Sequence, residues 1–502
     1  MDKLVRRILT SRVYEAAVET PLDTARQLSR TTGNRVLFKR EDLQPVFSFK
    51  LRGAYNKIVH LSDEERGRGI ITASAGNHAQ GVAYSAMQLG IRAVIVMPRT
   101  TPEIKVEAVR SLGARVVLHG DSYSDAAAHC LRLKKEQEMT FVHPFDDELV
   151  IAGQGTIAVE ILRQCPERVG KIFVPIGGGG LIAGIATYIK AICPQTEVVG
   201  VEPVDSNAMA RSLEAGHRVH LDSVGIFADG VAVKKVGSLT YNLCRRFVDE
   251  IVLVDTDEIC SAIKRIYQDT RSIAEPAGAL GVAGLVKYVR DRGITGQTLV
   301  AVNSGANMNF EGLGHVAERA QIGEKREALF AVTIPEKAGS LKRFCLDLVK
   351  ERNITELNYR LAGRERAHIL LGIAIQDGQE RHAFALQMTR KGFESIDLTD
   401  NELAKIHVRH MVGGRSSEAR REVLYRFWFP ERSGALRSFL EAMSEIWNIS
   451  LFHYRMQGGD YGNVLIGLEI PPHEDSKYHR FLNKLGYRYL EETDNAAYHV
   501  FM

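Results

Sequence analysis

Short apolar runs alternate with longer segments of helical character between about residue 36 and residue 310. The runs are rich in Val and Ile, as strands buried on both faces of a parallel sheet are. This alternation predicts an α/β architecture. The expected strands are Val36–Phe38, Ala93–Met97, Arg115–Leu118, Ile172–Ile176, Val198–Val201, Ile251–Val254 and Leu299–Val302, and the helices between them include Gln80–Leu89, Ile104–Leu112 and Leu181–Ala191.

The pattern changes after about residue 311, where Glu311–Glu327 is charged and interrupted by glycine, which indicates a helix followed by a linker. Beyond it lies an internal repeat with an offset of 95, the distance from Pro335 to Pro430. We therefore expect two copies of one module. The matching pairs are Pro335–Leu341 with Pro430–Leu436, Phe344 with Phe439, Asn353–Ile354 with Asn448–Ile449, Tyr359–Arg360 with Tyr454–Arg455, Gly372 with Gly467 and, shifted by one residue, Thr399–Asn401 with Thr493–Asn495.

Each copy begins with a strand, Leu329–Ile334 or Leu424–Phe429, followed by a Pro-Glu-x-x-Gly turn and a helix. The turn glycine permits a backbone conformation that other residues resist. Two further strands and a second helix complete a βαββα-type unit with an open sheet. The predicted domains are 1–320 for the α/β part, 328–410 for the first copy and 422–502 for the second, with a break at Val412–Ser417.

The composition is typical of soluble globular proteins, with 45% hydrophobic and 25% charged residues. The net charge of +4 is small and no block of like charges occurs, so neither nucleic acid nor a membrane surface is an expected partner. The six cysteines form no CxxC pair, no apolar segment is long enough to span a membrane, and the N-terminus lacks a signal-peptide pattern. A cytoplasmic location is expected.

Four consecutive glycines, Gly177–Gly180, follow one apolar run and precede an expected helix. A strand, a glycine loop and a helix start together present free backbone N–H groups to a phosphate. A dinucleotide-binding loop is the alternative. No Gly-Lys-Ser/Thr follows, which excludes a Walker-type loop, and the mid-chain position disfavours the GxGxxG pattern that Gly184 permits.

Lys50 stands in Ser48–Ala54, just ahead of a helix start that is rich in small residues. A lysine amine and a phosphate-binding loop together suit pyridoxal phosphate, whose aldehyde forms a Schiff base with lysine and whose ring makes the Cα–H of an amino acid acidic. Lys50 is the candidate for that Schiff base, although most lysines are solvated surface charges. Phe49 either packs near the cofactor or belongs to the core.

Two polar loops complete the candidate site. At an expected helix start, a substrate carboxylate could be bound by the N–H groups of Ser74, Ala75, Gly76, Asn77 and His78. The side-chain amide of Asn77 suits the ring oxygen of the cofactor. A simple helix N-cap by Ser74 or Asn77 explains this segment equally well. Ser304 follows the last apolar run. A serine at the pyridine nitrogen leaves that nitrogen largely unprotonated, which favours β-elimination or β-replacement over transamination, whereas a turn serine would carry no chemistry.

Together these segments resemble the biosynthetic threonine dehydratases, which have the tryptophan-synthase-β type (fold-type II) of pyridoxal phosphate fold with two doubly wound α/β subdomains. The resemblance covers nearly the whole chain, and the combination of its motifs with two C-terminal copies is what makes it specific. The motifs are Glu41-Asp42, Ser48–Ala54, Thr72–Gly81, Gly177–Leu181, Glu275-Pro276 and Ser304–Asn307.

The resemblance implies that Lys50 is the Schiff-base lysine and the base at Cα, that Asn77 binds the 3′ oxygen and that Ser304 binds the ring nitrogen. The phosphate cup would be Gly177, Gly178, Gly179, Gly180 and Leu181. It also implies dehydration and deamination of L-threonine, with L-serine as an alternative substrate, as the first committed step of isoleucine biosynthesis in a homotetramer. The two copies would be ACT-like regulatory domains at which isoleucine inhibits and valine opposes it.

Metal-binding relatives such as serine racemase carry an acidic pair near Glu202, whereas here Ala208 occupies the second acidic position, so no metal is expected. Tyr359, Arg360, Tyr454 and Arg455 are the candidate effector residues, because an arginine can hold a carboxylate bidentately; exposed sheet residues are the alternative. Another pyridoxal phosphate lyase and a non-catalytic amino-acid sensor are the competing functions.

Overall fold

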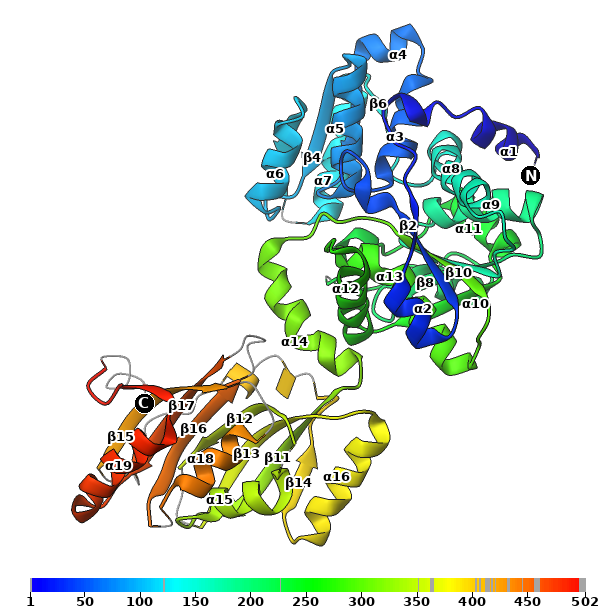
Figure 1. Ribbon diagram of the computed structural model, residues 1–502. Helices are drawn as coiled ribbons and strands as arrows, with labels where there is room; N and C mark the ends of the chain where they lie inside the picture. Colours follow the sequence, from blue (N-terminus) through cyan, green and yellow to red (C-terminus); the bar gives the residue numbers. More distant parts are fainter. Residues whose placement is uncertain are drawn as a thin grey trace. The chain divides into compact units, whose positions relative to one another are not determined.

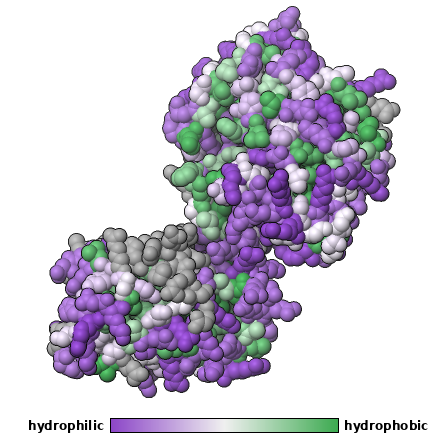
Figure 2. Space-filling model, viewed as in Figure 1, coloured by the Kyte–Doolittle hydropathy of each residue, from purple (hydrophilic) through white to green (hydrophobic). Residues whose placement is uncertain are grey.

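The computed structural model describes residues 2–120, 122–225, 227–350, 352–361, 365–401, 404–405, 408–410, 416, 419, 421–430, 434–444, 446–455 and 461–495. The chain divides into two compact units, Met1–Gly323 and Glu324–Met502 (Figure 1). The expected break at Val412–Ser417 lies outside the described residues, apart from Ser416. On the face shown in Figure 2, both units carry mostly hydrophilic residues with hydrophobic ones scattered among them. Within the described ranges, no helix is both long and apolar enough to cross a membrane.

The larger sheet of the first unit has parallel strands except for its antiparallel edge strand β1. Alternate residues of the central strand β10 enter two separate cores: Val300 and Val302 pack with α8 and α9, while Leu299 and Ala301 pack with α12 and α13. Burial on both faces explains why these strands appear as unbroken apolar runs. The order is β1 (Leu22–Thr24), β2 (Arg35–Arg40), β10 (Thr298–Asn303), β7 (Lys171–Pro175), β8 (Glu197–Pro203) and β9 (Glu250–Val254).

The smaller sheet is wholly parallel, in the order β5 (Arg115–Leu118), β4 (Ala93–Met97), β3 (Ile70–Ala73) and β6 (Thr140–Phe141). All seven strands expected in this unit are therefore confirmed. The helices of the unit are α1 (Asp2–Leu9), α2 (Arg26–Thr32), α3 (Lys50–Val59), α4 (Asp63–Arg68), α5 (Asn77–Leu89), α6 (Glu103–Arg110), α7 (Tyr123–Glu136), α8 (Glu148–Gln164), α9 (Gly180–Ile192), α10 (Ala208–Ala215), α11 (Ser238–Phe247), α12 (Thr256–Thr270), α13 (Pro276–Arg292) and α14 (Leu313–Gly323).

A buried ionic cluster fixes helix α3 in this unit. The Arg52 guanidinium donates to Glu41 at 2.7 and 2.8 Å and to Glu160 at 2.5 and 3.0 Å, and Lys39 lies 2.6 Å from Glu160. All four side chains are inaccessible to solvent. Burial alone would raise the pKa of Glu41, but Arg52 and Lys39 hold it below its ordinary value. The cluster thus ties α3 to α8 and to the end of β2.

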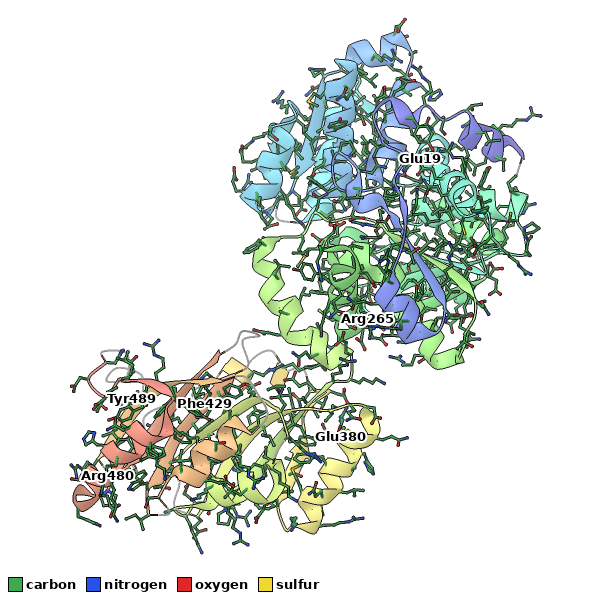
Figure 3. The ribbon with its side chains drawn as sticks, viewed as in Figure 1. Glu19, Arg265, Glu380, Phe429, Arg480 and Tyr489 are labelled. Carbon is green, nitrogen blue, oxygen red and sulfur yellow. The ribbon has the colours of Figure 1, made fainter. Side chains whose placement is uncertain are left out.

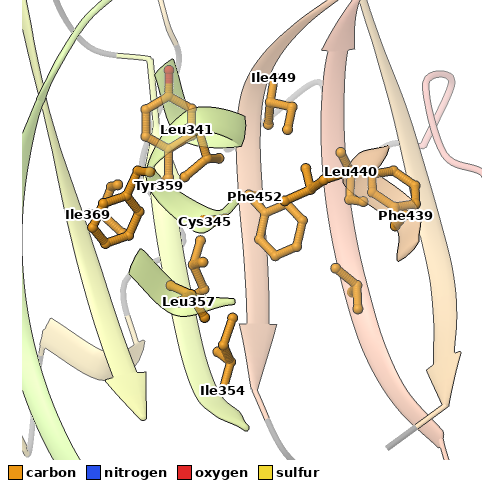
Figure 4. Close-up of a cluster of buried hydrophobic side chains, with 14 of the residues drawn as sticks. Leu341, Cys345, Ile354, Leu357, Tyr359, Ile369, Phe439, Leu440, Ile449 and Phe452 are labelled. Atoms are coloured by element: carbon orange, nitrogen blue, oxygen red, sulfur yellow. The ribbon is translucent and has the colours of Figure 1, made fainter. Parts of the chain in front are cut away.

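The second unit is one antiparallel sheet, formed edge to edge by the two copies of the repeat. Its order is β14 (Glu394–Asp397), β11 (Glu327–Pro335), β13 (Arg366–Ala374), β12 (Ile354–Arg360), β16 (Asn448–Arg455), β17 (Tyr461–Glu469), β15 (Glu422–Pro430) and β18 (Arg488–Glu491). One face packs on α15 (Ser340–Phe344), a π-helical turn η5 (Cys345–Val349), α16 (Gly378–Arg390), α18 (Ala435–Ala442) and α19 (Asp475–Leu485), and Figure 4 shows part of this core.

The two copies are related by an approximate twofold axis. At the junction Asn358 pairs with His453, which is its own counterpart 95 residues later. Leu357 pairs with the counterpart of Tyr359, and Tyr359 pairs with the counterpart of Leu357. The expected turn glycines adopt the same left-handed conformation, with φ of +81° at Gly339 and +82° at Gly434. The sequence repeat is therefore a repeat of structure.

Each copy departs from the expected βαββα unit by a fourth strand, β14 or β18, which pairs with the first strand of its copy. The sequence of β14 is Glu-Ser-Ile-Asp and its residues are mostly exposed, so an edge strand without an apolar pattern was missed. The repeated Thr-Asp-Asn motif, whose offset is shifted by one residue, makes the same contact in both copies. Thr399 accepts the N–H of Leu329, and Thr493 accepts that of Leu424, each at 3.0 Å.

Replacing Arg52 with leucine should destabilise the first unit by about 3–5 kcal/mol, because Lys39 would then be the one cation of the cluster left to balance two buried carboxylates. Scanning calorimetry of the full chain should show a lower Tm for that unit. Arg110→Leu is the matched control, because Arg110 pairs with Glu103 and Glu107 on an exposed helix face, and it should leave the Tm almost unchanged. Equal Tm values for Arg52→Leu and the parent chain would contradict a structural role for the cluster.

Candidate active site and effector site

Three loops meet at the carboxyl ends of the parallel strands, where α/β sheets bind their ligands. Backbone hydrogen bonds join two of them: Phe49 N donates to Ser304 O at 3.2 Å, and Ala306 N donates to Phe47 O at 2.9 Å. A third loop joins through Glu275 N, which donates to Gly305 O at 3.1 Å. The structure thus brings Lys50 and Ser304, which are far apart in sequence, to one place.

Lys50 is the first residue of α3, and its Nζ donates to Pro144 O at 3.2 Å. Burial lowers the pKa of Lys50 to about 8, although the Glu275 carboxylate opposes this effect. Gly53 lets α3 approach α8, because a Cβ there would lie 2.7 Å from Val150 O. The Lys50 amine therefore sits on an anchored helix and is partly neutral near neutral pH.

The glycine run lies at the carboxyl end of β7 and at the start of α9. A Cβ on Gly178 would lie 2.2 Å from the Phe145 ring, and Gly179 has a φ of +92°. These positions therefore require glycine. The N–H groups of Gly180 and Leu181, in the first turn of α9, have no partner within the helix and suit an anionic ligand.

Asn77 is held at both ends of its amide. Its Nδ2 donates to Glu275 Oε1 at 2.5 Å, and its Oδ1 accepts from Asn307 Nδ2 at 2.7 Å. Burial raises the pKa of Glu275 to about 7, against the hydrogen bond from Asn77. One N–H of Asn77 remains available, so the amide is oriented to donate to a further acceptor.

Helix α5 begins at Asn77 with Gly76 as its N-cap residue and without a side-chain cap, so the simple N-cap interpretation is not what the structure contains. Ser74 Oγ instead accepts the N–H of Gly76 at 3.3 Å. His78 Nε2 lies 3.0 Å from Val142 O, and burial lowers the pKa of His78 to about 3, so its ring is neutral. The start of α5 thus offers backbone N–H groups rather than a charged side chain.

Ser304 is buried at the end of β10, with its Oγ 3.4 Å from Ala277 O. Because this contact is long, the hydroxyl can turn to donate to another acceptor. Phe49, the N-cap residue of α3, packs against the core of the larger sheet, and its ring centroid lies 5.2 Å from Lys50 Nζ. Phe49 thus contacts the core and also lies beside the Lys50 amine, so its place near the cofactor stays a prediction.

These features fit pyridoxal phosphate. The Lys50 amine has a lowered pKa and suits the aldehyde, and the glycine run at the start of α9 suits the phosphate. The oriented amide of Asn77 and the hydroxyl of Ser304 suit the ring. Ser48 Oγ, beside Lys50, is buried without a protein partner, as expected for a group that faces a ligand. Sequence reasoning missed Phe145 and Thr240, whose Oγ1 donates to Gly178 O at 2.7 Å. It also gave Glu275 no role, although the Glu275-Pro276 motif marked its position.

Glu202 has an internal role. Its two carboxylate oxygens accept the N–H groups of Met209 at 2.9 Å and Ala210 at 2.8 Å at the start of α10. Burial raises the pKa of Glu202 to about 8. The carboxylate therefore caps a helix, and no group of three or more metal-ligating side chains occurs among the described residues.

Tyr359 and Arg360 lie on opposite faces of the second unit's sheet, because successive residues of a strand alternate. The Tyr359 hydroxyl donates to Glu336 Oε1 at 2.7 Å on the helix-covered face. Arg360 forms an ion pair with Glu422 of the other copy. Arg360 thus ties the copies together and does not share a pocket with Tyr359.

Two cavities flank the β12–β16 junction. The first and larger cavity is lined by Tyr454, by Phe429 (labelled in Figure 3) and by residues of the first copy's helix end. The second is lined by Tyr359 and by Trp447 of the second copy. The two candidate tyrosines therefore each line one cavity, whereas the Arg455 side chain lies outside the described residues.

Family comparisons agree with this geometry. Residues 13–305 match the family described as "Pyridoxal-phosphate dependent enzyme". Residues 318–408 and 413–502 match the family described as "C-terminal regulatory domain of Threonine dehydratase". The second match occurs twice, once for each copy of the repeat.

Full-length relatives are similar throughout. The chain is 57% identical over 501 residues to an L-threonine dehydratase biosynthetic IlvA of Burkholderia multivorans, covering 99% of both chains, and 50% identical to that of Escherichia coli, covering 99% of this chain and 96% of the other. Among solved structures, the processed threonine deaminase isoform 2 of Solanum lycopersicum shares 49% identity with a TM-score of 0.63, covering 64% of this chain and 93% of that one.

The lowered pKa of Lys50 predicts how the chain without cofactor takes up pyridoxal phosphate. The uptake rate should rise roughly tenfold per pH unit while Lys50 is protonated and level off above about 8, because only the neutral amine attacks an aldehyde. Stopped-flow absorbance would measure it, with N-acetyl-lysine and the same aldehyde as control. A rate that keeps rising to pH 10, as for the control, would contradict the prediction.

Proposed function

The chain belongs to the biosynthetic threonine dehydratases, and on that premise we propose that it is a pyridoxal-phosphate-dependent lyase that converts L-threonine to 2-oxobutanoate and ammonia. The observation that carries the proposal is the convergence of Lys50, the glycine run, Asn77 and Ser304 at one end of two parallel sheets.

Binding would use the groups already held in place. Gly177, Gly178, Gly179, Gly180 and Leu181 would donate N–H groups to the phosphate, Asn77 would donate to the ring oxygen, and Ser304 would face the ring nitrogen. The N–H groups of Ser74–His78 at the start of α5 would hold the substrate carboxylate. Glu275 and Asn307 would act through Asn77, by fixing which end of its amide donates.

When bound, pyridoxal phosphate supplies an electron-withdrawing ring that makes the Cα–H bond of the amino acid acidic. The free amine of Lys50 would take that proton, and a pKa of about 8 suits a base working near neutral pH. A serine hydroxyl at the ring nitrogen cannot hold a positive charge there as a carboxylate would. Ser304 thus favours rapid loss of the β-hydroxyl over transamination.

Purified chain with cofactor should form 2-oxobutanoate and ammonia from L-threonine, measured by a coupled 2-oxo acid assay. Lys50→Ala should lose more than about a thousandfold in rate and the visible absorbance of the lysine-bound cofactor. Lys57→Ala, near the end of the same helix, removes only an ion pair with Asp147 and should keep most activity. Full activity of Lys50→Ala would overturn the assignment, and turnover of L-serine alone would indicate a serine lyase.

For the second unit, we propose that isoleucine inhibits by binding at the junction of the two copies and that valine opposes it. Support comes from the regulatory-domain match and from the two cavities, each lined by one candidate tyrosine. Inhibition requires isoleucine to bind the less active state more tightly, so threonine must weaken isoleucine binding in return. Arg360 would contribute by holding the two copies together through Glu422.

Tyr454→Ala should raise the isoleucine concentration for half-inhibition about tenfold, because it removes a wall of the larger cavity. The measurement is the threonine-lyase rate at increasing isoleucine. Tyr489→Ala, on the edge strand β18, is the control and should leave the half-inhibition point unchanged. Identical isoleucine sensitivity in the Tyr454 variant and the parent would exclude this tyrosine from the effector site.

The homotetramer, which the resemblance implies, and the cytoplasmic location, which the sequence features indicate, remain predictions. None of the six cysteines forms a disulfide, which supports a reducing compartment. Light scattering of the purified chain would give its mass in solution.

A further inference from the structure

One short turn, residues 143–147, contacts four separate parts of the first unit around the candidate site. It connects β6 of the smaller sheet to α8, which packs on one face of the larger sheet. Pro144 O accepts the Lys50 amine at 3.2 Å. Asp147 accepts the first N–H groups of α8, and its other oxygen lies 2.8 Å from the Lys57 amine on α3. The two ends of the turn are thus tied to α3 and α8.

The middle of the turn supports the glycine run. The Phe145 ring occupies the space beside Gly178, where a Cβ would lie 2.2 Å from it, and a Cβ on Gly180 would lie 3.0 Å from Phe145 O. Asp146 accepts the first N–H groups of α11, including that of Thr240 at 3.1 Å. The Thr240 hydroxyl in turn donates to Gly178 O at 2.7 Å. The turn therefore reaches the candidate phosphate loop by two routes.

The ring of the first residue holds this turn together. His143 Nδ1 accepts two backbone N–H groups, from Phe145 at 3.2 Å and from Asp146 at 2.8 Å. Pro144 has no N–H, so these are the first two that the turn can offer. The ring lies nearly perpendicular to Phe141 and Phe145, with centroids 5.8 and 4.8 Å away. Nδ1 is therefore fixed as an acceptor inside the turn.

The two bonds to Nδ1 require a neutral ring, because an imidazolium carries an N–H on both nitrogens and accepts nothing. Burial lowers the pKa of His143; Asp146 and Asp147 oppose this effect and the Lys50 amine adds to it. The neutral ring carries its proton on Nε2, which has no hydrogen-bond partner among the described residues. The nitrogen that holds the turn and the nitrogen that carries the proton are thus different atoms.

We propose that His143 is a positioning residue of the cofactor site. Its Nδ1 holds the 143–147 turn, and the turn keeps the Phe145 ring against the glycine run and Pro144 O at the Lys50 amine. The phosphate loop before α9 and the reactive lysine on α3 thereby keep a fixed spacing. This inference rests on the proposed function and names a residue, outside the groups that would touch the cofactor, on which cofactor binding depends.

Two amide substitutions separate the roles of the two ring nitrogens. Asparagine places an acceptor oxygen near the position of Nδ1, whereas glutamine places its polar group near that of Nε2. The full-length chain, freed of cofactor, is titrated with pyridoxal phosphate and separately with pyridoxal, and binding is followed by absorbance. His143→Gln and His143→Leu should weaken pyridoxal phosphate binding at least about tenfold, and His143→Asn should stay within about threefold of the parent. The loss should be smaller for pyridoxal, which has no phosphate.

His217→Leu, which replaces an exposed histidine after α10, is the control and should bind both compounds as the parent does. Parent-like binding by His143→Leu would overturn the inference, as would binding kept by His143→Gln and lost by His143→Asn. Equal losses for pyridoxal phosphate and pyridoxal would overturn it too, because the glycine run would then not be involved. Thermal unfolding shows which variants fold, and if His143→Leu does not, the comparison of asparagine with glutamine decides.

The outcomes also separate this inference from the proposed function. If the parent chain binds no pyridoxal phosphate, both fail together. If it binds the cofactor but does not convert threonine, the proposed function fails, while the binding titrations still decide the role of His143.

Discussion

The active site depends on the buried cluster in which Arg52 bridges Glu41 and Glu160. Two cations and two carboxylates are removed from water together, and their mutual hydrogen bonds offset the cost of desolvation. Because Arg52 lies two residues after Lys50 on the same helix, the cluster determines where the Lys50 amine can reach. Lys50, the Schiff-base candidate, is thus positioned by charged side chains that take no part in the proposed reaction.

Burial disfavours the charged form of several ionisable groups of the site. It lowers the pKa of Lys50 to about 8, raises that of Glu275 to about 7 and keeps His78 neutral. Each shift disfavours a charge in a poorly solvated place. The result is a site that can hold a neutral amine and that reserves its N–H groups for anionic ligands. Two of the three loops that form it follow the neighbouring strands β2 and β10, and the third, which carries Glu275, joins α12 to α13 and is held to the loop after β10 by a backbone hydrogen bond.

The second unit shows how a duplicated sequence acquires structural differences between its copies. One continuous sheet with an approximate twofold axis produces two cavities, and a few substitutions then separate them. Where the first copy has Arg352 and a π turn, the second has Trp447 and a regular helix. Duplication supplies the framework, and side chains at equivalent positions decide whether a cavity stays open. Figure 4 shows buried hydrophobic side chains of both copies, such as Leu357 and Phe452, in the core around this junction.

The sequence by itself determined seven strands of the first unit, because burial on both faces leaves unbroken apolar runs, but not the short strands β1, β3 and β6. It also determined the repeat, and the residue types that suit pyridoxal phosphate. It could not determine the edge strand β14, which has no apolar pattern, or that the copies join through β12 and β16. Only the tertiary structure placed Glu275 and Asn307 on Asn77, Phe145 against the glycine run, and Tyr359 and Arg360 on opposite faces of a sheet. These are contacts between residues distant in the chain, and a local pattern carries no information about which distant segment will lie beside it.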